Sequence, residues 1–238
     1  MEKKKIVTII LLVTLPVTTA LATFFIVRAV SQYNYEKKQQ KLYQAAYEMH
    51  YQDRCTLFEE ENKHLSDVDV AFIGDSLTEG YDVKSYYPQY NVVNRGIGGD
   101  TTFGVEKRLQ VSAYDVHPKV ATLLIGANNF DSMFENYENI LKGFKDNIPT
   151  TRIILLSLTS MTKNWGRNNQ KAQKNNERIK AYAEQYSYTY VDLYHPLLDE
   201  NTNELKLEYT TDGGHLTPLG YEKITAIIEP VISQELSK

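Results

Sequence analysis

The sequence predicts an α/β protein whose parallel sheet is covered by helices on both faces. From residue 68 to the C-terminus, short apolar runs rich in β-branched residues alternate with longer amphipathic stretches. The short runs are typical of buried strands and the longer stretches of surface helices. Their alternation is the pattern of strands that are joined by helical crossovers and lie parallel. In such sheets the reactive groups collect at the carboxyl ends of the strands, and polar, glycine-containing segments follow three of the predicted strands.

The individual elements follow from these patterns. The predicted strands are residues 68–73, 90–93, 120–125, 152–158 and 189–193. The predicted helices of the same region are residues 103–111, 134–146, 168–186 and 218–236. Upstream, residues 31–62 are polar and contain neither Gly nor Pro, and Leu42, Ala45 and Met49 lie on one stripe at helical spacing. This segment predicts a helical stalk that docks on the domain, and a helix that binds a partner is the alternative.

The N-terminal segment has the composition of a membrane anchor. Three lysines at residues 3–5 precede an apolar stretch over residues 6–30, which contains several Thr residues and Pro16. About 25 helical residues span about 37 Å, enough to cross a hydrocarbon core of about 30 Å with some tilt. The lysines favour an orientation with the remainder outside the cytoplasm, although Arg28 opposes it. A cleaved signal peptide is the alternative, because Ala-Leu-Ala at residues 20–22 resembles a cleavage site. The apolar run continues beyond that site, which favours the uncleaved anchor.

Composition and length limit the domains and partners. The expected division is an anchor over residues 1–30, a helical stalk over 31–66 and one domain over 67–238, which is long enough to bury its own core. The formal net charge of -4 argues against a nucleic-acid partner, which would require clustered Lys and Arg. Cys55 is the single cysteine and excludes an intramolecular disulfide. The five histidines lack the close spacing of a zinc site, and His195, which precedes a proline, is interpreted as a turn residue.

The first polar segment, Gly-Asp-Ser-Leu-Thr-Glu-Gly at residues 74–80, directly follows the first predicted strand. A serine at a strand-to-helix turn has an exposed hydroxyl and a backbone N–H near a helix N-terminus, where negative charge is favoured. Ser76 is therefore a candidate nucleophile. Its simpler interpretation is the N-cap of the following helix, and this segment alone leaves both open.

The second segment, residues 94–102, follows the next predicted strand and contains three glycines. Glycines let the backbone approach a ligand closely and direct its N–H groups at it. A dinucleotide-binding loop is a rival, because Gly-Ile-Gly at residues 96–98 begins like that fingerprint. However, Thr101 stands where the third small residue is required, and no ribose-binding acid follows in a βαβ context.

The third segment, Gly-Ala-Asn-Asn at residues 126–129, follows the strand over 120–125. The side-chain amide of Asn128 is a candidate hydrogen-bond donor to a developing oxyanion. Stabilisation of that charge contributes strongly to the rate of acyl transfer. Taken in isolation, an Asx-turn is the commoner role of an Asn after a strand.

The fourth segment, residues 211–221, precedes the last predicted helix. Asp212 and His215 lie three residues apart on a glycine-containing loop, so the carboxylate is able to fix the tautomer of the imidazole and leave its other nitrogen to accept a proton. The segment also has the residues of a helix entry, with Thr217 as the cap and Pro218 in the first turn. The two interpretations are compatible.

Together and in this order, the four segments resemble the SGNH (GDSL-like) hydrolase family, and the resemblance extends from about residue 68 to the C-terminus. The residues that match its four blocks are Ser76 after Gly74-Asp75, Gly98 with Gly99, Asn128, and Asp212 with His215. Residues 96–102 and 126–129 are most similar to the branch of platelet-activating-factor acetylhydrolase catalytic subunits and bacterial acylesterases. Many members carry Asp in place of Asn129, a departure that bears on a supporting contact rather than on the oxyanion donor.

The resemblance implies a three-layer α/β/α, flavodoxin-like fold with a central parallel sheet, and a serine esterase that requires no cofactor. Ser76 would attack the ester carbonyl, His215 would accept its proton and later protonate the leaving alcohol, and Asp212 would orient His215. The oxyanion would be held by the backbone N–H groups of Ser76 and Gly99 and by the Asn128 amide. The Gly-x-Ser-x-Gly elbow of α/β-hydrolases is absent from the sequence.

The expected reaction is the hydrolysis of short-chain acyl esters, such as acetyl esters, at the extracytoplasmic face of the membrane. The anchor would hold the enzyme beside the envelope, so an acylated envelope glycan or lipid is the expected substrate. A lysophospholipase or thioesterase of the same family is the enzymatic alternative, and a non-catalytic glycan-binding module is the alternative from another class. Trp165, in the loop after residues 152–158, is left outside the predicted site, because a packing role explains it equally well.

Overall fold

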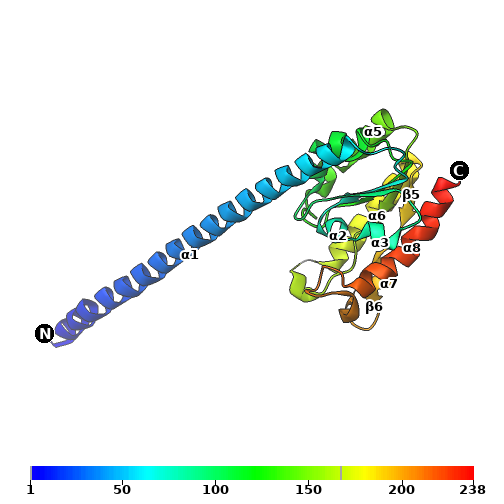
Figure 1. Cartoon of the computed structure of the whole chain (residues 1–238). Coiled ribbons are helices and arrows are strands. Elements are labelled where there is room, and N and C mark those ends of the chain that lie inside the picture. Colours follow the sequence, from blue (N-terminus) through cyan, green and yellow to red (C-terminus); the bar gives the residue numbers. More distant parts are fainter. Residues whose placement is uncertain (1, 167) are drawn as a thin grey trace. The chain divides into compact units, whose positions relative to one another are not determined.

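The computed structural model describes residues 2–166 and 168–238, with side chains from residue 18 onward. The chain divides into two compact units, whose boundary in the sequence lies between Met49 and His50. Helix α1 (Glu2–Asn62) contributes to both, because its last turns belong to the C-terminal unit (Figure 1).

Within the part of the chain that the structure describes, no helix combines the length and the hydropathy needed to cross a membrane. The anchor expected over residues 6–30 falls partly outside that part, since the side chains of residues 6–17 are not among those described.

Five parallel strands form the central sheet, in the order β2-β1-β3-β4-β5. Their bounds are β1 Val70–Gly74, β2 Val92–Gly96, β3 Val120–Leu124, β4 Arg152–Leu156 and β5 Thr189–Val191. The five predicted strands and their parallel arrangement are thus confirmed. Gly74 at the end of β1 lies opposite Gly96 of β2 and Leu124 of β3. The loops that follow these three strands therefore start at the same edge of the sheet.

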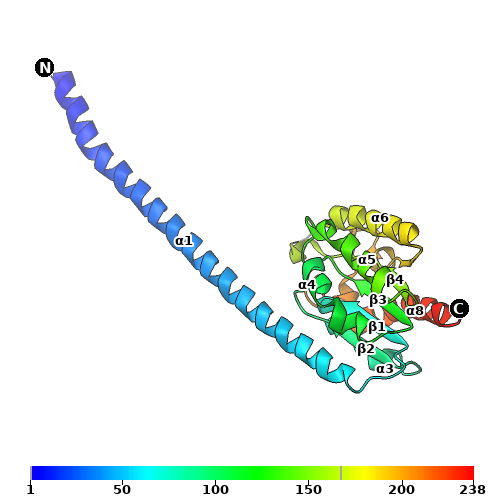
Figure 2. The same ribbon diagram turned by 90° about the horizontal axis from the view of Figure 1, so that it is seen from above.

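Alternate side chains of each strand enter two separate cores. Ala71 and Ile73 of β1 face one core, whereas Val70 and Phe72 face the other. Helices α4 (Thr102–Lys107), α5 (Tyr137–Asn147) and α6 (Asn169–Tyr186) cover the first face, and α2 (Ser76–Glu79), α3 (Val83–Tyr86) and α8 (Pro218–Leu236) cover the second. Figures 1 and 2 show the sheet between these two sets of helices, as the sequence predicted.

Short elements complete the domain. They are α7 (Tyr194–Leu197), the antiparallel pair β6 (Leu198–Asp199) and β7 (Glu204–Leu205), three 3₁₀ turns (Met133–Glu135, Lys163–Trp165, Leu207–Tyr209) and a π-helical turn (Gln110–Tyr114). The helix predicted over residues 103–111 is interrupted, because α4 ends at Lys107 and the side chain of Arg108 runs into the interior.

The C-terminal end of α1 packs on the domain. Phe58 is fully buried in a small cluster with Ile97 and Val111. The guanidinium groups of Arg54 and Arg95 lie 4.8 Å and 4.6 Å from the centre of the Phe58 ring, a separation that favours a cation–π contact. The docking expected of this helix is therefore made by its last turns.

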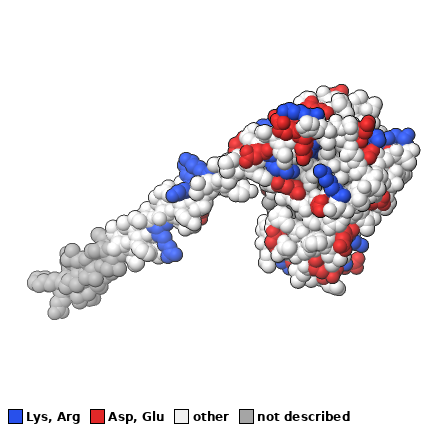
Figure 3. All heavy atoms as spheres, in the orientation of Figure 1, with Lys and Arg blue, Asp and Glu red and all other residues white. Residues whose placement is uncertain are grey.

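Charged side chains of both signs are interspersed on the face of the domain drawn in Figure 3. Such a mixed surface agrees with the small formal net charge of -4.

Candidate active site

Ser76 is the first residue of α2, two residues after the end of β1. The cap of this helix is Asp75, because its Oδ1 accepts the backbone N–H of Leu77 at 3.1 Å. The capping alternative for Ser76 is therefore not the arrangement found. The turn is also tight: a Cβ at Gly74 would lie 2.4 Å from the carbonyl oxygen of Leu124. The Ser76 hydroxyl is held half-buried at the sheet edge.

The fourth predicted segment brings its histidine to this serine. Nε2 of His215 lies 2.9 Å from Oγ of Ser76, and Nδ1 of His215 lies 2.7 Å from Oδ2 of Asp212. When Nδ1 carries the ring hydrogen and donates it to the carboxylate, Nε2 is the acceptor that faces the hydroxyl. The structure thus joins three residues that are up to 139 positions apart in one hydrogen-bonded chain.

The carboxylate of Asp212 is also fixed by the backbone of its own loop. Its Oδ1 accepts the N–H of His215 at 2.9 Å and the N–H of Gly214 at 3.0 Å. Partial burial acts to raise the pKa of Asp212, but the hydrogen bonds from His215 and Gly214 outweigh it, and the pKa lies below its ordinary value. The group is therefore ionised at neutral pH, as a partner that orients an imidazole must be. The same segment starts α8, with Thr217 as the cap and Pro218 as first residue, so both interpretations hold.

The loop after β4 supports the aspartate–histidine loop. The N–H of Thr162 donates to the carbonyl of Gly213 at 2.8 Å. The half-buried Trp165 ring lies almost perpendicular to the ring of His215, with the ring centres 4.8 Å apart. A Cβ at Gly214 would lie 2.3 Å from the Trp165 ring, so this close approach requires glycine. Trp165 was not among the predicted site residues, although its place in the loop after a strand was a signal for it.

The glycine-rich segment and Asn128 lie next to each other. Gly99 has a φ of +78°, in the left-handed region that favours glycine. The side-chain Nδ2 of Asn128 donates to the carbonyl of Asp100 at 2.8 Å, and the N–H of Asp100 closes a turn on the carbonyl of Ile97 at 3.1 Å. Asn128 is thus tied to the neighbouring loop at the residue after Gly99. The neighbouring Asn129 holds the same region, because its Nδ2 donates to Oγ1 of Thr102 at 2.8 Å.

A buried ion pair lies beneath these loops. Arg108 and Asp100 are 2% and 0% exposed, and Nε of Arg108 lies 2.8 Å from Oδ2 of Asp100. Arg108 also donates to the carbonyls of Arg95 at 2.8 Å and Gly74 at 2.9 Å. One guanidinium therefore links the residue after Gly99 to the strand end that precedes Ser76. Arg108 was not among the predicted site residues, although its position three residues after Val105 places it on the apolar stripe of the helix predicted over residues 103–111.

Comparisons with known proteins agree with this geometry. Residues 72–223 match the model of the GDSL-like lipase/acylhydrolase family, and the chain belongs to that family. The structure is similar to that of a Streptococcus pneumoniae protein assigned as a platelet activating factor, with 26% sequence identity, a TM-score of 0.76, and coverage of 81% of this chain and 97% of the other. A GDSL-like lipase from Bacteroides thetaiotaomicron has 26% identity and a TM-score of 0.68, with 76% and 97% covered.

An acetyl-xylooligosaccharide esterase from Geobacillus shares the fold, with 19% identity, a TM-score of 0.57, and coverage of 70% of this chain and 94% of the other. No curated protein sequence matches the chain significantly. The family, together with the GDSL-like lipase and a Bacteroides fragilis acylhydrolase of similar structure, defines the class of protein: a serine hydrolase that acts on ester bonds.

Proposed function

We propose that this enzyme hydrolyses short-chain acyl esters, acetyl esters above all, through an acyl-enzyme on Ser76. The observation that carries the proposal is the chain of hydrogen bonds from Ser76 Oγ through the two nitrogens of His215 to Asp212, with distances of 2.9 Å and 2.7 Å. A nucleophile within hydrogen-bond reach of a base that a third group orients is the general arrangement for covalent catalysis.

Acylation forms a bond between Ser76 Oγ and the ester carbonyl carbon. Nε2 of His215 accepts the hydroxyl proton and then passes it to the leaving alcohol oxygen as the ester bond breaks. In the second half of the reaction, His215 takes a proton from water, whose oxygen attacks the acyl carbon. His215 then returns that proton to Ser76 Oγ as the bond between Oγ and the acyl carbon breaks and the acid leaves. Asp212 stays ionised throughout and stabilises the imidazolium that forms in each half.

The oxyanion is held by the backbone N–H groups of Ser76 and Gly99 and by the side-chain amide of Asn128. The fixed position of Asn128 beside the Gly99 loop supports this role. Preorganised donors of this kind stabilise the charge that develops only in the transition state.

Asn128→Ala is expected to lower kcat by about 10²-fold or more, with little change in KM, because one oxyanion donor is lost. Steady-state kinetics with p-nitrophenyl acetate measures the effect. Asn175→Ala is a matched control, since that amide donates to the carbonyl of Phe130 and the sulfur of Met133 instead. Near-normal turnover in a folded Asn128→Ala enzyme would rule out the donor role.

The substrate class is tested by comparing p-nitrophenyl esters of increasing chain length with acetylated oligosaccharides, all on the full-length protein in detergent. We expect kcat/KM for acetyl esters to exceed that for octanoyl esters by about tenfold or more, since the proposed short-chain preference requires an acyl site that discriminates against added methylenes. The opposite order would favour the lysophospholipase or thioesterase alternative.

We further propose that residues 6–30 remain attached as a membrane anchor and that the domain lies outside the cytoplasm. The lysines at residues 3–5 and the apolar run that extends past residue 22 support this topology. The intact mass of the membrane-extracted protein should include residues 1–30, and protease added to intact cells should digest the domain. A mass that corresponds to a chain beginning after residue 22 would show signal-peptide cleavage instead.

A further inference from the structure

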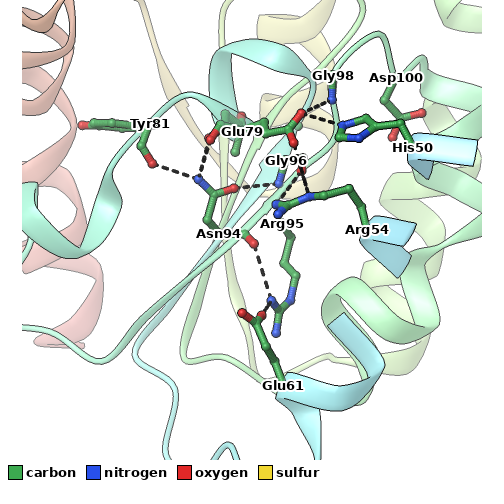
Figure 4. A network of polar contacts seen from close by, with 12 residues as sticks. His50, Arg54, Glu61, Glu79, Tyr81, Asn94, Arg95, Gly96, Gly98 and Asp100 are labelled. Atoms are coloured by element: carbon green, nitrogen blue, oxygen red, sulfur yellow. Dashed lines mark hydrogen bonds and ion pairs between the residues drawn. The ribbon is translucent and has the colours of Figure 1, made fainter. Parts of the chain in front are cut away.

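Glu79 connects α2 to the loop that carries Gly99. It lies three residues after Ser76, and its Oε2 accepts the backbone N–H of Gly98 at 2.5 Å (Figure 4). The two segments are also in close contact, because a Cβ at Gly96 would lie 2.1 Å from the backbone nitrogen of Glu79. Glu79 therefore accepts a hydrogen bond from the peptide group between Ile97 and Gly98. The next peptide group along the chain carries the N–H of Gly99.

The C-terminal end of α1 holds the same carboxylate from the other side. Nε2 of His50 lies 3.1 Å from Oε2 of Glu79, and Nε of Arg54 lies 3.5 Å from Oε1. Arg54 also donates from Nη2 to the carbonyl of Gly96 at 3.0 Å. Figure 4 shows these side chains converging on the loop from opposite sides.

The hydrogen bonds from Arg54 and to Glu79 hold the backbone on the two sides of Ile97. Arg54 fixes the carbonyl of Gly96, Glu79 fixes the N–H of Gly98, and Ile97 between them is fully buried against Phe58 of α1. The side chains of Arg54 and Glu79 are only 21% and 27% exposed, so water screens their interaction less than that of a surface pair.

We propose that Glu79 and Arg54 are positioning residues that set the direction of the Gly99 N–H, so that the docked end of α1 is part of the catalytic apparatus. The role rests on the proposed function, because it concerns a donor of the oxyanion site. Neither residue touches the reacting atoms. They act through the backbone of residues 96–98. The glycines of this loop, including Gly99 in the left-handed region, would otherwise have wide conformational freedom. A small displacement of a catalytic group is costly, on the order of 10²-fold for about 1 Å.

The test compares Glu79→Ala, Glu79→Gln and Arg54→Met in the full-length enzyme. Glu79→Ala and Arg54→Met are each expected to lower kcat for p-nitrophenyl acetate by about 10- to 100-fold with KM little changed. Glu79→Gln should recover part of the loss, because its amide oxygen still accepts the Gly98 N–H. The double variant Glu79→Ala/Arg54→Met should lose little more than the larger single effect, since both residues act on one loop.

Glu60→Gln is the matched control. Glu60 lies on the exposed side of α1 and pairs with Lys63 at 2.6 Å, so its loss should leave kcat unchanged.

Amide hydrogen exchange at Gly98, measured by NMR, gives a readout that does not depend on catalysis. Glu79→Ala should accelerate exchange there by about tenfold or more relative to wild type and Glu60→Gln. If the wild-type enzyme is active and Glu79→Ala has normal kcat or normal Gly98 exchange, the positioning role is wrong and the proposed function stands. A wild-type protein without esterase activity would overturn the proposed function and this role together.

Discussion

Replacing His215 by alanine is expected to lower kcat by about 10⁴-fold or more, because Ser76 then lacks the base that removes its proton. Ser76→Ala should have an effect of similar size. The double variant should be scarcely worse than either single variant, since in the proposed mechanism the two residues act as one unit and residual catalysis would come from the proposed oxyanion donors. Steady-state rates with p-nitrophenyl acetate test all three enzymes.

His195→Ala provides an unusually close control. His195 forms the same kind of pair as His215, with its Nδ1 2.6 Å from Oδ2 of Asp192, which also lies three residues earlier in the chain. His195 is not part of the proposed site, so its removal should leave kcat within a small factor of wild type. Equal losses in His195→Ala and His215→Ala would show that the loss reflects damage to the fold rather than to catalysis.

The second large effect concerns stability. Arg108→Met is expected to lower the free energy of unfolding by about 3–5 kcal/mol, because it leaves the carboxylate of Asp100 buried without its counter-charge. The carbonyls of Gly74 and Arg95 each lose the hydrogen bond from this guanidinium at the same time. Urea unfolding followed by circular dichroism measures the change.

Two comparisons separate this effect from the loss of any charged side chain. Lys119→Met removes a surface ion pair with Asp69, in which the lysine side chain is 57% exposed, and should cost less than about 1 kcal/mol. Asp100→Asn combined with Arg108→Met should recover part of the loss, because the uncompensated charge is removed. A cost for Arg108→Met as small as that for Lys119→Met would contradict the role assigned to the buried pair.

The fold was predictable from the sequence because burial on both faces demands apolar residues. Each strand from β1 to β5 overlaps an apolar run rich in β-branched residues, and such runs are typical of strands buried on both faces. The end of α4 was less predictable. Periodicity favoured a continuous helix there, and the inward ion pair of Arg108 with Asp100 is a tertiary contact that local patterns do not encode.

The candidate site was predictable where residue chemistry and strand ends coincide, as at Ser76 and Asn128. The histidines show the limit of this reasoning. Asp192 and His195 have the same spacing as Asp212 and His215, and only the folded chain shows that Nε2 of His215 reaches Ser76. Glu79 and Arg54 were not identified, since their contacts with the Gly99 loop join segments from three parts of the sequence.

Labelling with a fluorophosphonate, which reacts with activated serine hydroxyls, tests the central claim most directly. The full-length protein is labelled, digested with trypsin and analysed by mass spectrometry. We predict a single adduct in the peptide of residues 64–84, with fragment ions that place it on Ser76 rather than Ser66, and no adduct in His215→Ala. Labelling at another serine, or labelling of Ser76 that is equally fast without His215, would contradict the proposed nucleophile and base.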